Sequence, residues 1–350
     1  MTNLYDLTLE QLSALLESWA EPRFRAQQIW DWLYDQRVSD FDAMTNLPRK
    51  LRDRLRTETT LGVLEIAAEQ ASHDGTVKRL YRLPDSQMIE SVLMPYDDDR
   101  RTACISTQAG CAMGCVFCAT GQMGFARHLT AAEIFEQAVR FAGDLEREGE
   151  RLSNVVLMGM GEPFHNYAAS VAAVCRLMSD LGIGARHITI STVGLAPQIR
   201  QFADEGLQVK LAISLHAATD VEREALLPVN RRWPLRELLA ACAYYIERTG
   251  RRISFEWTAI HGQNDTLEQA HALGKLLQGM LCHVNIIPLN PTGGYPYGPA
   301  AADRIQQFIA VLADYGVSAT VRVRRGIDID AGCGQLKAAV LRRQRQSTNT

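Results

Sequence analysis

The first sixty residues have the apolar spacing of amphipathic helices. Leucines recur every three or four positions and so share one helical face; they are Leu9, Leu12, Leu15 and Leu16. Thr8 precedes this series, and Gln11 stands three residues after Thr8, which is the pattern of a capping box. Further helices are expected after Pro22 and Pro48, since the first helical turn tolerates proline. We therefore predict a small helical domain over residues 1–60.

Residues 61–97 have the pattern of paired strands. The segments 76–83 and 87–95 are strand-like, and the turn-forming sequence Pro84-Asp85-Ser86 separates them. This pattern predicts a β-hairpin that links the helical domain to the rest of the chain.

From residue 98 to residue 340, strand-like and helix-like segments alternate. The expected strands are 102–107, 153–159, 186–191, 209–214, 252–257, 283–287 and 317–323. The expected helices are 130–145, 167–181, 234–248, 265–279 and 301–315. This alternation predicts an α/β fold with a parallel sheet, either a partial (β/α)6 barrel or a doubly wound sheet. In both folds the active site lies at the C-terminal ends of the strands. Residues 341–350 are expected to form a polar tail.

The composition is that of an ordinary globular protein. Of the 350 residues, 47% are hydrophobic and 22% are charged. No apolar run reaches the roughly 20 residues that cross a bilayer, and the N-terminus lacks the basic start and apolar core of a secretion signal. These features predict a cytoplasmic protein with no membrane partner. The net charge of -3 does not decide about RNA, but local arginine clusters such as that in residues 49–56 are candidate RNA-binding surfaces.

Three of the eight cysteines lie within eight residues of one another. Cys111, Cys115 and Cys118 occupy a glycine-rich loop between an expected strand and an expected helix. Three thiolates on one loop can bind three irons of a 4Fe-4S cubane and leave the fourth iron open, as a reactive metal site requires. Zinc is the alternative, because Cys-x2-Cys is also half of a zinc site. The nearest later candidate ligands, His128 and Cys175, do not have the spacing of a second pair.

This Cys-x3-Cys-x-aromatic-Cys loop, placed after the first strand of a β/α domain, resembles the radical SAM superfamily. The resemblance implies a 4Fe-4S cluster whose open iron binds S-adenosylmethionine (SAM). It also implies that an electron from the cluster cleaves SAM to a 5′-deoxyadenosyl radical.

Two further cysteines narrow the resemblance. Cys104 lies seven residues before Cys111, and Cys333 stands between two glycines, whose backbone freedom exposes its thiol. The other three cysteines lie in apolar contexts and are interpreted as core residues; they are Cys175, Cys242 and Cys282. The segments FRAQQIWDWLY, RTACISTQAGC, MGMGEP, SLHA, NPTG and GIDIDAGCGQL then follow in order. Over nearly its whole length the chain resembles the RlmN/Cfr family of radical SAM RNA methyltransferases.

The resemblance implies a role for individual residues. The cluster ligands would be Cys111, Cys115 and Cys118. Cys333 would be S-methylated, Cys104 would close a transient disulfide with it, and Glu90 would accept a proton. The SAM contacts would be Gly161, Glu162, Ser191, Ser214, Leu215, His216 and Asn290.

The implied reaction is methylation at C2 of an adenosine in the peptidyl-transferase centre of 23S rRNA, and of the adenosine 3′ of the anticodon in tRNA. Two SAM molecules would be used per turnover, with an electron donor such as flavodoxin or ferredoxin and a disulfide reductant as partners. A radical route is needed because both C2 of adenine and the methyl of SAM are electron-poor. Three alternatives stay open: Cfr-like methylation at C8, a radical SAM enzyme with another substrate, and a zinc-stabilised RNA-binding module without activity.

Overall fold

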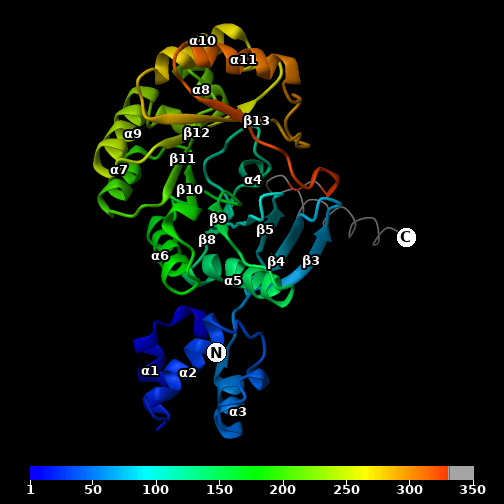
Figure 1. The fold of residues 1–350 in the computed structure, drawn as a ribbon, viewed down its shortest axis with the longest axis vertical. Helices are drawn as coiled ribbons and strands as arrows, with labels where there is room; N and C mark the ends of the chain where they lie inside the picture. The colour runs from blue at the N-terminus through cyan, green and yellow to red at the C-terminus, as the bar shows by residue number, and fades with distance from the viewer. Residues whose placement is uncertain (330, 332–350) are drawn as a thin grey trace.

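The computed structural model describes residues 1–329 and residue 331. Its N-terminal part is helical and lies at one end of the molecule (Figure 1). The helices are α1 (Leu9–Ser18), α2 (Phe24–Tyr34) and α3 (Arg49–Glu58). The expected capping box of Thr8 and Gln11 is present at the start of α1. The short strands β1 (Thr2–Asn3) and β2 (Thr59–Thr60) pair in parallel and bring the two ends of this part together.

Seven parallel strands form most of the central sheet. They are β6 (Arg101–Cys104), β9 (Asn154–Leu157), β10 (Ile188–Thr192), β11 (Lys210–Ser214), β12 (Ile253–Ala259), β13 (Cys282–Pro288) and β14 (Ala319–Val321). Each strand pairs with the one before it in this series. A doubly wound sheet reverses its strand order at a switch point, so this order excludes that alternative. Because β14 is an edge strand among the described residues, the sheet is an open, partial barrel as predicted.

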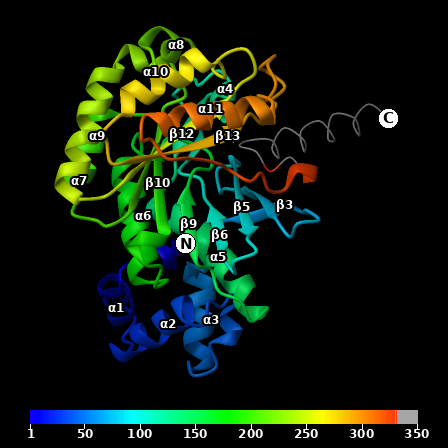
Figure 2. The same cartoon turned by 45° about the horizontal axis from the view of Figure 1, so that its top comes forward.

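Helices follow the parallel strands and cover one face of the sheet (Figure 2). They are α5 (Ala131–Arg147), α6 (Tyr167–Ser179), α7 (Ala196–Asp204), α8 (Asp220–Leu226), α9 (Leu235–Thr249), α10 (Leu267–Leu277) and α11 (Ala302–Asp314). The sequence pattern predicted five of these seven but neither α7 nor α8, which are short. The sheet-facing side chains of the helices and strands form one continuous hydrophobic core.

The predicted hairpin is present as β4 (Val77–Arg82) and β5 (Met88–Pro95). A third strand, β3 (Glu65–Ala71), pairs with β4, and β5 pairs antiparallel with β6. The hairpin therefore extends the central sheet. The sequence of β3 is EIAAEQA, and alanine and glutamate are depleted in strands, which is why the pattern missed it.

The helical N-terminal part and the segment that follows it are attached to α5 and α6 by half-buried and buried polar groups. From α6, Arg176 donates hydrogen bonds to the Tyr5 carbonyl and the Tyr34 hydroxyl, and its guanidinium lies 4.2 Å from the centre of the Phe135 ring. From α5, the Glu136 carboxylate accepts hydrogen bonds from the backbone N–H groups of Val63 and Leu64 at 2.8 and 3.1 Å. These directional contacts fix the orientation of residues 1–60 on the sheet domain.

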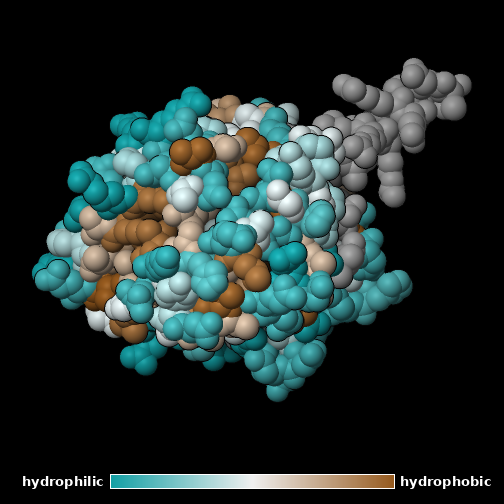
Figure 3. Space-filling model, turned by 90° about the horizontal axis from the view of Figure 1, so that it is seen from above, coloured by the Kyte–Doolittle hydropathy of each residue, from teal (hydrophilic) through white to brown (hydrophobic). Residues whose placement is uncertain are grey.

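The surface seen from above mixes hydrophilic residues with small hydrophobic patches (Figure 3). Among the described residues, no helix is both long enough and apolar enough to span a bilayer.

Helix α5 begins at a capping box in which the Thr130 hydroxyl accepts from the Glu133 N–H, and the Glu133 carboxylate accepts from the Thr130 N–H. We expect Thr130→Ala to lower the free energy of unfolding by about 1 kcal/mol, because the helix loses one of its N-terminal acceptors. Thr130→Ser keeps the hydroxyl and should stay within about 0.5 kcal/mol of the parent. Urea unfolding measures both, and equal losses in the two variants would contradict the capping role.

Candidate active site

The cysteine loop is held between two short antiparallel strands, β7 (Gln108–Gly110) and β8 (Phe125–His128). The Cys111 N–H donates to the Gly124 carbonyl at 2.9 Å, which closes the base of the loop. Gly110 has φ +76°, and a Cβ there would lie 2.0 Å from the Gly124 oxygen. Only glycine can therefore occupy position 110. The short helix α4 (Ala119–Gln122) begins directly after Cys118.

The three thiols of the loop are half-buried and close enough to influence one another. Burial raises the pKa of Cys111 to about 12, with Cys118 adding to the rise. Burial also raises the pKa of Cys115 well above its ordinary value, and the neighbouring Cys118 and Cys111 raise it further. Such thiols are neutral on their own and ionise when a cation binds them.

The three cysteines of the loop can act as donors to a cluster. Within residues 1–329 and 331, no three His, Cys, Asp or Glu side chains converge on a point that one metal ion could occupy. A structural zinc ion needs four such ligands around one centre. In a cubane each thiolate binds a different iron, so the thiols need not converge. The three cysteines are thus a suitable donor set for three corners of a 4Fe-4S cluster.

The Glu162 carboxylate is buried beside this loop. It accepts hydrogen bonds from the N–H groups of Phe164 at 2.9 Å and Val193 at 2.7 Å. The Glu162 N–H donates to the Gln108 side chain at 2.8 Å. Burial raises the pKa of Glu162 to about 7, although the two backbone hydrogen bonds act in the opposite direction. A cation next to this carboxylate would stabilise the charged form.

Gly159 and Gly161 allow the loop after β9 to lie directly on β7 and on the segment that follows β6. A Cβ at Gly159 would lie 2.6 Å from the Ser106 hydroxyl and 2.8 Å from backbone atoms of Ile105. A Cβ at Gly161 would lie 2.6 Å from the Gln108 side chain, and Gly161 also has φ +101°. Both glycines are therefore required by close contacts, and Gly161 also by its backbone conformation.

The remaining predicted SAM-contact residues on β10 and β11 lie at the C-terminal ends of these strands. Ser191 is the penultimate residue of β10, and Ser214 ends β11. His216 has φ +60°, and its Nδ1 accepts from the Thr258 N–H at 2.9 Å. Burial, followed by Arg223, lowers the pKa of His216 to about 3, so this imidazole is neutral. Leu215, between Ser214 and His216, is fully buried.

Arg223 fixes these strand ends and was not identified from the sequence. Its buried guanidinium donates to the carbonyls of Val193 at 2.6 Å, Ser214 at 3.2 Å and Leu215 at 3.2 Å. Burial lowers its pKa to about 10. Nothing in the apolar pattern of α8 distinguishes this arginine from a solvent-exposed one, because its partners are carbonyls from other segments.

A cavity of about 240 Å³ at the same end of the sheet contains three of the predicted residues. It is lined by Cys104, Cys118 and Asn290, together with Ala331. Burial raises the pKa of Cys104 to about 11, and Glu90 also raises it while Arg322 lowers it. Glu90 is buried in β5, on the side of the strand that carries Val92, the residue paired with Cys104. Cys104 and Glu90 therefore lie near one another, with Cys104 at the cavity wall and Glu90 outside the set of residues that line it.

The other cysteines differ in where they lie. Cys333, the predicted methyl carrier, falls outside the residues that the structure describes. Of the three cysteines interpreted as core residues, Cys242 and Cys282 are buried as expected. Cys175 is exposed on α6, so its interpretation as a core residue was wrong. It lies in an apolar helix, but on the side of that helix that faces solvent.

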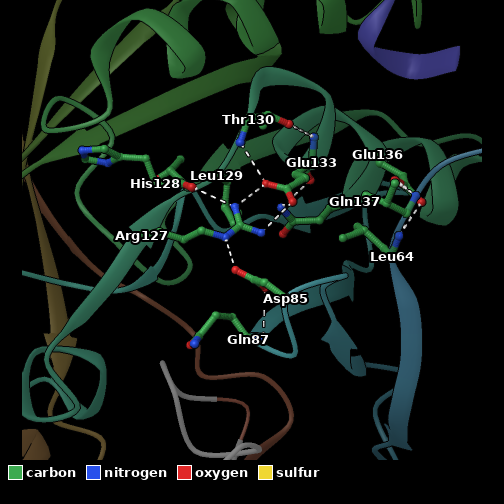
Figure 4. A network of polar contacts seen from close by, with 12 residues as sticks. Leu64, Asp85, Gln87, Arg127, His128, Leu129, Thr130, Glu133, Glu136 and Gln137 are labelled. Carbon is green, nitrogen blue, oxygen red and sulfur yellow. Dashed lines mark hydrogen bonds and ion pairs between the residues drawn. The ribbon is translucent and has the colours of Figure 1, made fainter. Parts of the chain in front are cut away.

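An ion-pair network fixes β8 to its neighbours (Figure 4). Arg127 donates to the Glu133 carboxylate at 2.8 Å and to Asp85 at 2.5 Å, which connects β8 to α5 and to the turn between β4 and β5. Next to it, the Gln108 amide contacts the Nδ1 atoms of His128 and His165 at 3.0 and 3.1 Å. The strand that closes the cysteine loop is thus held by directional contacts on both sides.

Comparison with known proteins identifies the family. The model for the N-terminal domain of ribosomal RNA large subunit methyltransferases matches residues 2–61, and the radical SAM superfamily model matches residues 105–273. A curated relative from Myxococcus xanthus (strain DK1622), named dual-specificity RNA methyltransferase RlmN 1, is 56% identical over 99% of this chain and 98% of its own length. The chain belongs to the RlmN family of radical SAM RNA methyltransferases.

A further relative and a solved structure support the same family assignment. A probable dual-specificity RNA methyltransferase RlmN from Geobacillus thermodenitrificans (strain NG80-2) is 45% identical over 97% of this chain and 93% of its own length. The crystal structure of a radical SAM methyltransferase from Sphaerobacter thermophilus has 50% identity and a TM-score of 0.92, and covers 96% of this chain and 99% of that one. These matches confirm the family resemblance and the fold class predicted from the sequence, and membership of the RlmN family implies SAM and a 4Fe-4S cluster.

The close contact at Gly161 can be separated from its backbone strain. Gly161→Ala adds a Cβ at φ +101° against Gln108, whereas Gly149→Ala adds one at φ +75° with no atom within 4 Å. Both variants should lose about 1 kcal/mol or more from left-handed strain, and Gly161→Ala about 1–3 kcal/mol in addition from overpacking. Urea unfolding of the two variants measures the difference, and equal losses would contradict the contact.

Proposed function

We propose that this chain methylates C2 of the adenosine in the peptidyl-transferase centre of 23S rRNA, and of the adenosine 3′ of the anticodon in tRNA. The methyl group passes through S-methylated Cys333, and two SAM molecules are used per turnover. The observation that carries this proposal is the cavity that contains Cys104, Cys118 and Ala331 at the C-terminal ends of the strands.

The chain length between Ala331 and Cys333 supports a meeting of Cys333 with Cys104. Two residues span at most about 7 Å, and Ala331 already lines the cavity that contains Cys104. Two thiols that form a transient disulfide must approach one another this closely. A second candidate reaction, the Cfr-like methylation at C8, uses the same residues. We rank it below methylation at C2 because curated relatives that are named RlmN match the chain along nearly its whole length.

In the proposed site, Cys111, Cys115 and Cys118 bind the 4Fe-4S cluster. The Glu162 carboxylate faces the ammonium group of SAM, whose positive charge would lower the pKa of Glu162 from its buried value of about 7. When bound, the cluster and SAM supply the 5′-deoxyadenosyl radical that starts the reaction. The further proposed SAM contacts are Gly161, Ser191, Ser214, Leu215, His216 and Asn290.

The thiolate of Cys333 first takes a methyl group from SAM by displacement, forming a thioether. Removal of one hydrogen atom from this methyl leaves a methylene radical on Cys333, and the radical adds to C2 of adenine. The adduct loses the C2 proton, for which Glu90 is the proposed acceptor, and its unpaired electron, for which the oxidised 4Fe-4S cluster would be the one-electron acceptor. The thiolate of Cys104 then attacks the sulfur of Cys333, the carbon–sulfur bond breaks, and the released carbon takes a proton to become the methyl group.

The product of this last step is a Cys104–Cys333 disulfide, which a dithiol reductant must reopen before the next turnover. A flavodoxin or ferredoxin is the proposed electron donor for the radical step. The burial that raises the pKa of Cys104 to about 11 keeps this thiol protonated at neutral pH. Glu90 lies near Cys104 and is therefore a candidate to receive the thiol proton, once it has released the proton taken from C2.

Residues 1–60 are the proposed RNA-binding part of the chain, and α3 carries most of their arginines. Four arginines of this helix pair with acidic side chains; the pairs are Arg49–Asp53, Arg52–Asp42, Arg54–Glu58 and Arg56–Asp42. Paired cations offer less charge to phosphates than unpaired ones. Replacing the arginines between positions 49 and 56 by glutamate should therefore weaken RNA binding. The loss should be smaller than the number of arginines in this segment would predict.

The cluster assignment is tested by metal analysis. Cys115→Ala should lower the iron content of anaerobically reconstituted protein from about four atoms per chain to a small residue and remove its brown colour. Cys175→Ala is the matched control, because Cys175 is exposed on α6, away from the loop. Full iron in the Cys115 variant would exclude Cys115 as a ligand, and bound zinc in the parent would favour the zinc alternative.

The reaction is tested by anaerobic turnover with SAM, a strong reductant and a 23S rRNA fragment, followed by mass spectrometry of the RNA digest. We expect 2-methyladenosine from the parent and none from Cys333→Ala or Cys104→Ala, whereas Cys282→Ala should stay active. 8-Methyladenosine would move the chain to the Cfr branch. Release of 5′-deoxyadenosine without any methylated adenosine would mean that the substrate assignment is wrong.

A further inference from the structure

A second cavity, of about 710 Å³, opens at the opposite end of the parallel strands. Its lining includes residues near the strand starts, namely Asn154 in β9, Lys210 in β11, Ser254 in β12 and Thr320 in β14. At its inner end it reaches Met158, Arg322 and Val323, which also line the 240 Å³ cavity. In β/α folds this end usually serves stability, while chemistry takes place at the other end. The strand-start end of this cavity is therefore not explained by the methyl transfer.

Three cations meet at the mouth of this cavity without an acidic partner. Lys210, Arg251 and Arg252 all line it, and none of them forms an ion pair within the part of the chain that the structure describes. Burial lowers the pKa of Lys210, and Arg251, Arg100 and Arg252 lower it further. Lys210 and Arg252 are exposed and Arg251 is half-buried, so solvent screens part of the repulsion between these like charges. An anion bound between them would reduce the repulsion further.

The other charged groups at the cavity do not neutralise these three cations. Arg322 is a further cation in its lining, and it lowers the pKa of Glu256, which burial raises. Arg100 is paired with Asp98 at 2.8 Å. Glu256 is the one carboxylate among the described lining residues, and its oxygens already accept hydrogen bonds from Ser254 at 3.0 Å and Asn285 at 2.8 Å. Glu256 lies in the interior of β12, whereas Arg251 and Arg252 precede the strand. The positive charge is therefore concentrated at the mouth.

The cations at the cavity mouth differ from those of α3 in having no acidic partner among the described residues. The arginine-rich sequence of α3 is the more obvious basic segment, yet its arginines are paired within the domain. At the cavity mouth, Lys210 comes from a different segment than the adjacent Arg251 and Arg252, so the sequence does not reveal the three as a cluster. Guanidinium groups bind phosphates through two parallel hydrogen bonds, and an unpaired guanidinium has these donors available.

We propose that the mouth formed by Lys210, Arg251 and Arg252 binds a phosphate group, at the strand-start end of this cavity and away from Cys104. The volume behind the mouth is in the range of cavities that hold a small ligand such as a nucleotide, and Asn154 and Thr320 supply neutral hydrogen-bonding groups there. The phosphate belongs either to a free nucleotide or to the backbone of an RNA that passes over the mouth.

The test uses the full chain and three probes. Binding of pyrophosphate and of AMP is measured by calorimetry, and binding of a labelled 23S rRNA hairpin by fluorescence anisotropy at several salt concentrations. The test variant is Arg251→Gln with Arg252→Gln. The matched control is Arg236→Gln with Lys275→Gln, which removes the same charge from exposed positions of α9 and α10 that do not line the cavity.

We expect the test variant to bind at least one probe about tenfold more weakly, or worse, than the control variant does. Loss confined to AMP and pyrophosphate would identify a free nucleotide as the source. Loss of RNA affinity, with a salt dependence reduced by about one unit per cation, would identify the RNA backbone. Equal affinity of the test and control variants for all three probes would overturn the proposal.

Two further measurements separate a loss of phosphate binding from a loss of folding or of methyl transfer. Removing like charges should leave the melting temperature unchanged or raise it, and Lys210→Gln provides a second variant if the double variant unfolds. The turnover assay with the Cys104 and Cys333 variants reports on the other end of the sheet, so failure of either proposal leaves the other standing.

Discussion

The buried carboxylate of Glu162 is the contact on which the active-site end of the sheet depends. Its two oxygens accept from backbone groups after β9 and after β10, and its own N–H is held by Gln108 of β7. Three separate strand ends are thereby fixed around one polar group. Leaving such a group without partners in the core would cost several kcal/mol, so the surrounding loops have little freedom to move independently. Arg223 continues this arrangement to the end of β11 through three backbone carbonyls.

Much of the fold could be predicted from the sequence because its signals are local. The alternation of strands and helices from residue 98 onward follows from apolar periodicity, and the capping boxes at Thr8 and Thr130 mark helix starts by residue type alone. β3 was missed because its alanines and glutamates do not favour a strand, and it is stabilised by pairing with β4 instead. That the strands form an open sheet in chain order depends on which edges pair, and this is decided by contacts distant in sequence.

Some residues of the candidate site could likewise be recognised from the sequence, and others could not. The cysteine loop is recognisable because three ligands and their glycines are close in sequence, and the segment 159–162 for a similar reason. Arg223 and Gln108 act through carbonyl and amide groups from other segments, so their residue types and spacing give no signal. The cations at the second cavity are likewise brought together only by the register of β11 and β12, whereas the conspicuous arginines of α3 prove to be largely paired.

The strand order of the sheet has a consequence for biosynthesis. From β3 to β14, each strand of the ten-stranded sheet lies beside the sheet strand that precedes it in the chain. During translation every newly emerged strand therefore finds its partner already present, and the sheet can grow at one edge without waiting for a later segment. Pairing between neighbours in the chain keeps loop closure short, which favours fast assembly. Cys333, the proposed methyl carrier, follows β14 in the chain, so translation adds this residue only after all ten strands of the sheet.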